Sequence, residues 1–221
     1  MRQFEFPYNF DKELIKCLRV LDPLGITIDC IYMPPYLADY KTFFRNPESK
    51  QQIESMTRFE YEDHIKFINS MFPGKIQILL QKKELLLPKN KINYYLSFGI
   101  TKFCVASIEQ AKIIKDINPN VSIVGSISMA INKEKIEQDF DEYKKYFNSF
   151  VLPFSACRCL HEIKDLPQDF SYILLVNGYC NVNCKGIHHW SSTYESENGK
   201  PRKPVPCPGL LSSKPDTISW D

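Results

Sequence analysis

Five of the eight cysteines lie in the C-terminal third of the chain, a concentration that core packing does not require. No secretory leader is visible, so we expect the chain in the cytoplasm, where disulfides are rare. Cysteine thiolates are ligands that suit zinc and iron–sulfur clusters. These residues therefore predict a metal centre, and its candidate ligands are Cys157, Cys159, Cys180, Cys184 and Cys207.

Two of these cysteines, Cys180 and Cys184, come soon after an apolar run at 172–176 that predicts a buried strand. Active sites of parallel α/β folds form at the carboxyl ends of the strands. Gly178 and Gly186 supply the backbone freedom that would let both sulfurs turn toward one ion. We therefore expect Cys180 and Cys184 to be the first two ligands; the alternative is a pair of buried or free thiols.

The third expected ligand is Cys207, which prolines on both sides would hold rigid. The fourth is left open, and the candidates are Cys157, Cys159, His188 and His189. A radical-SAM loop would need another cysteine at position 187, where this chain has isoleucine, which argues against that class of enzyme.

Candidate catalytic and substrate-binding residues surround this centre. His188 and His189 could act as acid and base, or one could be exposed while the other caps a helix. Asn9, Gln81 and Arg58 are polar residues expected at the rim of the barrel, where they could contact substrate. Bonding within turns or at helix ends explains these three residues equally well.

The rest of the chain alternates apolar strands with amphipathic helices. Such alternation predicts an α/β fold with a parallel sheet, and its six or seven strands indicate a (β/α)-barrel-like architecture, complete or incomplete. No glycine-rich phosphate loop follows any strand, which disfavours a Rossmann site. The predicted domains are a barrel at 1–176 and a cysteine- and proline-rich metal-binding tail at 177–221. The expected strands are 3–8, 26–33, 75–80, 102–106, 121–127, 149–153 and 171–176, and the main helices 9–21, 57–72, 90–98, 108–117 and 133–147.

Composition narrows the classes of function. The 221 residues are 43% hydrophobic and 24% charged, which is typical of a globular chain, and the net charge is only +2. A balance this close to neutral argues against a broad nucleic-acid-binding surface. No apolar run reaches the length of a membrane span. The three remaining cysteines, Cys17, Cys30 and Cys104, stand singly in apolar segments and are expected in the core.

Several segments together resemble a known family. Phe6-Pro7-Tyr8-Asn9, Val105-Ala106-Ser107, Phe150–Phe154 and the stretch 174–180 that ends at Cys180 are similar to the collagenase-like peptidases, the thirty-second family of peptidases of unknown type. The resemblance implies a (β/α)-barrel-like domain with a four-cysteine iron–sulfur cluster of the 4Fe-4S kind. It also implies a part in oxygen-independent hydroxylation of ubiquinone precursors or RNA bases, although some members were named as proteases. Cys180 and Cys184 match the ligand positions of the family.

Three functions follow from these residues. The first is an iron–sulfur-dependent enzyme that carries out hydroxylation or a related redox modification. The second is a zinc-dependent hydrolase or peptidase, with Glu195 and Glu197 as the nearest acidic residues. The third is a non-enzymatic protein in which the metal only holds the tail against the barrel. The expected substrate is a small molecule, a peptide or RNA, and a protein partner is also possible under these hypotheses.

Overall fold

A computed structural model describes residues 2–36, 55–80, 87–129, 131–153, 163–175, 196–197 and 200–201. The chain divides into two compact units, one made of residues 1–125 and 145–148 and the other of residues 126–144 and 149–221. The two units are described separately below.

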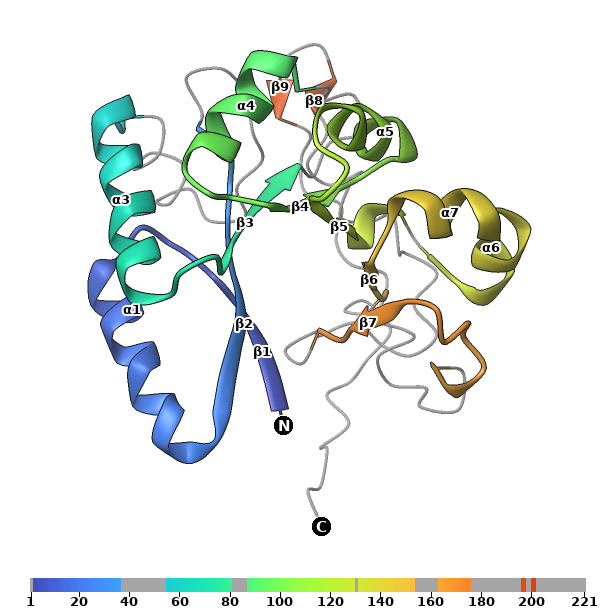
Figure 1. Ribbon diagram of the computed structural model, residues 1–221, viewed down its shortest axis with the longest axis horizontal. Helices are drawn as coiled ribbons and strands as arrows, with labels where there is room; N and C mark the ends of the chain where they lie inside the picture. Colours follow the sequence, from blue (N-terminus) through green and yellow to red (C-terminus); the bar gives the residue numbers. More distant parts are fainter. Residues whose placement is uncertain are drawn as a thin grey trace. The chain divides into compact units, whose positions relative to one another are not determined.

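The first unit is built on five parallel strands, which lie in the sheet in the order in which they occur along the chain (Figure 1). The predicted strand at 26–33 is confirmed with both of its ends. The others are confirmed within two residues of their predicted ends. The strands are β1 (Arg2–Pro7), β2 (Ile26–Met33), β3 (Ile76–Leu80), β4 (Lys102–Val105) and β5 (Ser122–Gly125).

Helices follow these strands, and most of them begin at a residue whose side chain caps the helix. Asp11 caps α1 (Lys12–Leu18), which continues as the 3-10 helix η1 (Arg19–Leu24). Thr57 and Glu60 form a complete capping box at the start of α3 (Arg58–Met71). The other two helices of this unit are α4 (Lys89–Ser97) and α5 (Ile108–Ile117), the latter capped by Ser107. In Figure 1, α1 lies beside α3, and α4 lies near α5.

The sheet of the first unit has two faces of different chemistry. Met33, Ile78 and Phe103 are in register on neighbouring strands, and each is 0% exposed. This apolar face forms the core that the sheet shares with its helices. Residues of the other face are more polar, because charged and amide side chains interrupt the apolar strands there. We call this face the polar face; it carries Glu5, Cys30, Gln77, Lys102 and Cys104.

A β-bulge changes the register between β1 and β2. Phe4 lies opposite Ile28 and Glu5 lies opposite Cys30, so Asp29 has no partner residue on β1. A bulge puts two successive residues on the same side of the strand. Asp29 consequently reaches the polar face, where it pairs with Lys102 and Lys75.

The second unit contains two further parallel strands, β6 (Ser149–Val151) and β7 (Ser171–Ile173), which pair with each other. It also contains the 3-10 helix η3 (Ile127–Met129) and a short antiparallel ladder of β8 (Ser196–Glu197) and β9 (Lys200–Pro201). The sequence predicted no strands in the segment that forms this ladder.

Two predictions for the second unit were wrong. The single helix expected over 133–147 is two helices, α6 (Lys133–Gln138) and α7 (Phe140–Tyr146). The backbone leaves the helical region at Asp139, a residue type whose side chain competes with helical hydrogen bonds. The strand expected at 171–176 is shorter and is not fully buried, since Leu174 is 40% exposed.

The described residues thus contain seven parallel strands, with helices after most of them. The predicted α/β fold of incomplete (β/α)-barrel type is confirmed. The predicted division at residues 176 and 177 stays a prediction. None of the helices that the structure describes has the length and apolar composition that a membrane crossing requires.

Candidate functional site

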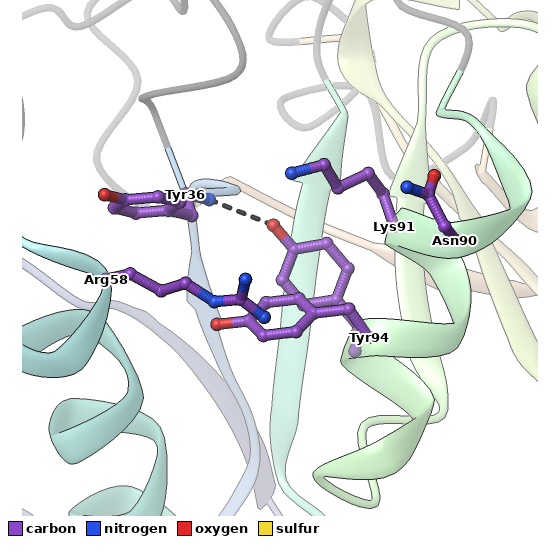
Figure 2. Close-up of a pocket in the computed structure, with 6 residues that line it drawn as sticks. Tyr36, Arg58, Asn90, Lys91 and Tyr94 are labelled. Atoms are coloured by element: carbon purple, nitrogen blue, oxygen red, sulfur yellow. Dashed lines mark hydrogen bonds between the residues drawn. The ribbon is translucent and has the colours of Figure 1, made fainter.

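A pocket of about 180 Å³ opens in the first unit beyond the carboxyl end of β2 (Figure 2). Tyr36 reaches it from the segment that follows β2, and Arg58 reaches it from the first turn of α3. The remaining lining residues come from α4, the helix that follows β3. The pocket is lined by Tyr36, Arg58, Asn90, Lys91, Tyr94 and Tyr95.

Arg58 is held in place from two directions. Its Nε donates a hydrogen bond to Glu62 Oε1 at 3.0 Å, one helical turn further along α3. Its guanidinium lies 4.5 Å from the centre of the Tyr94 ring, within the range of a cation–π contact. Tyr94 Oη donates to the same Glu62 oxygen at 3.3 Å, so one carboxylate orients both the cation and the ring.

Arg58 stays protonated and Tyr94 stays uncharged near neutral pH. The hydrogen bond to Glu62 raises the pKa of Arg58 above its ordinary value. Burial, followed by the nearby Glu62 charge, raises the pKa of Tyr94 to about 12. The pocket therefore presents a permanent cation stacked on a neutral phenol.

A second set of contacts anchors the opposite wall. The backbone N–H of Tyr36 donates to Tyr95 Oη at 2.9 Å, the bond drawn in Figure 2. Tyr61 Oη donates to the Pro34 carbonyl at 2.7 Å, and the rings of Tyr36 and Tyr61 lie 5.4 Å apart. These bonds tie the segment after β2 to α3 and α4, which fixes the distance between the pocket walls.

The predicted substrate-binding residues have different outcomes. Arg58 lines the pocket, although its contact with a substrate stays a prediction. Asn9 is exposed outside this pocket, and its Oδ1 accepts a hydrogen bond from the Asp11 backbone at 3.3 Å, which is the turn bonding that was the alternative. Gln81 lies outside the described residues. Sequence reasoning missed Lys91, Tyr94 and Tyr95. The signal that could have indicated them is a lysine and two tyrosines close together in the helix that follows a strand.

The five expected cysteine ligands and both candidate catalytic histidines lie outside the described residues. They are Cys157, Cys159, Cys180, Cys184, Cys207, His188 and His189. Within the part of the chain that the structure describes, no three His, Cys, Asp or Glu side chains gather as metal ligands would.

The strands that precede these cysteines are described, and they run in parallel. Val151 lies opposite Ile173, and the Leu152 backbone N–H donates to the Ile173 carbonyl at 3.0 Å. The chain consequently leaves β6 and β7 at the same end of the pair. Of the three single cysteines, Cys30 and Cys104 are buried as predicted, whereas Cys17 is exposed on the outer side of α1 and that prediction was wrong.

A charged cluster on the polar face was not anticipated from the sequence. Lys102 Nζ lies 3.1 Å from the backbone carbonyl of Asp29 and 3.3 Å from its Oδ2. Burial and the Asp29 charge raise the pKa of Glu5 to about 7, and Lys102 opposes that rise. Gln77 is 2% exposed, and its Oε1 has no hydrogen-bond partner among the described residues.

At the end of β1, two aromatic side chains pack against α3. Tyr8 and Phe10 are both 4% exposed, and Phe10 has a positive φ of 63°, a conformation that non-glycine residues rarely adopt. The His64 ring lies 5.6 Å from the Tyr8 ring and 5.3 Å from the Phe10 ring, in edge-on contacts. This cluster joins the turn after β1 to the middle of α3.

Comparison with known proteins identifies the fold. No protein-family model matches the chain, and no curated protein matches it. The solved structure of the U32 peptidase Mk0906 is similar, with a TM-score of 0.56 and 12% sequence identity over 79% of this chain and 67% of that one. At this identity the likeness shows the fold alone. It supports the resemblance to the collagenase-like peptidases at the level of a distant relationship in fold.

Proposed function

We propose that the protein is an iron–sulfur-dependent enzyme that carries out oxygen-independent hydroxylation or a related redox modification. The observation that supports it most is the parallel pairing of β6 and β7. One cysteine-containing stretch follows each of these strands, so both stretches leave the sheet at the same end. Active sites of this class of fold are built at that end of the strands.

The chain lengths are compatible with one shared centre. Cys157 is four residues beyond Pro153, and Cys180 is five residues beyond Leu175. Neighbouring strands are about 4.8 Å apart, and an extended chain spans roughly 3.3–3.6 Å per residue. Each stretch could therefore cross the distance between the strands, which supports a ligand set drawn from both.

The donor set fits an iron–sulfur cluster. Four thiolates complete the usual ligation of a 4Fe-4S cluster, and Cys180, Cys184 and Cys207 with either Cys157 or Cys159 would supply them. Such a cluster would supply one-electron transfer to a bound substrate. His188 and His189, close to Cys184 in the sequence, would then move protons to and from that substrate.

A zinc-dependent peptidase is the second candidate, because the structural neighbour is a U32 peptidase. In that case Cys180, Cys184 and one histidine would hold the ion, and a water molecule would occupy the open position. The same thiols could also form a closed structural site in which the metal only holds the tail against the barrel.

The deciding experiment is analysis of iron, zinc and acid-labile sulfide in protein purified without oxygen. The proposal expects a brown protein with about four iron and four sulfide per chain. Cys180→Ser should remove both iron and sulfide, whereas the exposed Cys17→Ser should retain them. About one zinc per chain with no sulfide would overturn the cluster in favour of the zinc hydrolase or the closed structural site.

A further inference from the structure

We propose that the pocket lined by Arg58, Lys91 and Tyr94 binds the phosphate group of a small phosphomonoester. This site lies wholly within the first unit and uses none of the cysteines. The proposal therefore goes beyond the iron–sulfur function and does not depend on it.

The charge of the lining selects an anion. Arg58 and Lys91 bring two cations to one small pocket, Asn90 adds an amide, and none of the described residues that line it is acidic. Among the described residues, Glu62 contacts this lining and accepts hydrogen bonds from Arg58 Nε and Tyr94 Oη. A phosphomonoester is largely a dianion at neutral pH, so it matches two cations better than a carboxylate does.

The position of Arg58 favours binding of a phosphate through the two terminal nitrogens of its guanidinium. Glu62 uses the Nε–H, and the two terminal nitrogens carry the remaining four N–H groups of the guanidinium. Stacking on Tyr94 and pairing with Glu62 fix the guanidinium before a ligand arrives. Less conformational entropy is therefore lost on binding than with a free arginine side chain.

Lys91 completes the arrangement from the other helix. Figure 2 shows its side chain extending from α4 toward Tyr36, and both Lys91 and Arg58 line the pocket. A guanidinium supplies paired donors in a plane, and an ammonium supplies a compact point charge. Together they can contact different oxygens of one phosphate.

The size of the pocket limits the ligand. Pockets for drug-sized ligands have volumes of about 300–1,000 Å³. About 180 Å³ is enough for a phosphate and the atoms next to it, so the rest of the ligand would lie outside. Both a sugar-type phosphate and a nucleotide could present such a group.

Titration calorimetry on the full chain tests the proposal with four probes: inorganic phosphate, glycerol phosphate, adenosine monophosphate and benzoate. Phosphate should bind with a Kd on the order of 1 mM, and at least one of the two esters should bind more tightly. Tighter binding of adenosine monophosphate would identify a nucleotide source, and tighter binding of glycerol phosphate a source without a base.

Variants locate the binding. Arg58→Gln and Lys91→Gln should each weaken ester binding by roughly tenfold or more. Lys89→Gln removes the same charge from an exposed position of α4 outside the pocket, so it should change binding less than about twofold. Melting curves confirm that each variant is folded.

Three outcomes would overturn the assignment. They are the absence of binding of every phosphate probe at millimolar concentration, equal or tighter binding of benzoate, and an effect of Lys89→Gln as large as that of Lys91→Gln. The first outcome removes the site, the second makes it a carboxylate site, and the third reduces it to general surface charge. Metal content is unaffected by all of them, so a failure here is separable from a failure of the iron–sulfur proposal.

Discussion

The Tyr8 hydroxyl lies 2.6 Å from His64 Nδ1, and this contact joins the end of β1 to the middle of α3. Burial, followed by the positive charge of Lys12, lowers the pKa of His64 below 6.5, so the neutral ring accepts the hydrogen bond. Tyr8→Phe removes the donor that favours the neutral ring, and the pKa of His64 should rise toward its ordinary value. Titration by NMR measures this shift; Tyr172→Phe, which loses a hydrogen bond to Pro167, is the control.

The same pair makes stability depend on pH. The unfolded chain binds a proton on this histidine more readily than the folded protein does, because only the folded ring has a lowered pKa. The contribution of the pair is complete above pH 6.5 and is lost as the pH falls through that value and below it. Urea unfolding of His64→Gln should show a weaker loss of stability on acidification than the wild type; an equal loss would contradict this account.

Glu5 should have the opposite effect. Its pKa is raised by burial from 4.5 to about 7, so the folded protein holds this proton more tightly than the unfolded chain. Stability should fall as the pH rises from 4.5 to about 7, at up to about 1.4 kcal/mol per pH unit. Glu5→Gln stays neutral, so it should be more stable than the wild type at pH 8, as measured by urea unfolding. The exposed Glu13→Gln should keep the wild-type profile.

Lys102 and Lys75 both pair with Asp29, but they should contribute unequally. Lys102 Nζ bonds to the carbonyl and carboxylate of Asp29 and is 24% exposed in its side chain, whereas Lys75 Nζ is 3.7 Å from Oδ1 and 35% exposed. Lys102→Met should cost about 1–3 kcal/mol because it leaves a partly buried carboxylate with fewer partners. Lys75→Met should stay within about 0.5 kcal/mol. Equal losses in urea unfolding would refute this ranking.

The capping box of α3 gives a prediction that does not involve buried charge. Thr57 Oγ1 accepts from the Glu60 backbone N–H at 3.3 Å, and Glu60 Oε2 accepts from the Thr57 backbone N–H at 2.7 Å. Thr57→Ala should lower the free energy of unfolding by about 1 kcal/mol, and Thr57→Ser should retain most of it. Thermal unfolding of the three proteins distinguishes a lost cap from a lost methyl group.

Local signals in the sequence were sufficient to predict most of the helices and strands of the first unit. The Thr57–Glu60 box, the Asp11 and Ser107 caps and the apolar runs of β2 and β3 each predict their element without tertiary information. These signals act over a few residues, where side chain and backbone meet directly. The alternation of such elements was enough to predict the fold class.

Other features depend on contacts between distant residues. The pocket joins residues from 36 to 95, and no pattern within one segment indicates that Glu62 orients Arg58 toward Tyr94. Cys17 was placed in the core because of its apolar neighbours, yet it lies on the exposed side of α1. The break at Asp139 was missed because apolar spacing continues across it from Ile136 to Tyr143.

The extra residue in β2 interrupts the regular alternation of side chains along the strand. On its two sides, odd and even positions exchange the faces to which they point, and Asp29 is the single residue that makes the exchange. Deleting Asp29 would restore an uninterrupted ladder with β1 and would also remove the acceptor of Lys102. One supernumerary residue thus supplies the carboxylate that pairs with both lysines of this cluster, Lys75 and Lys102.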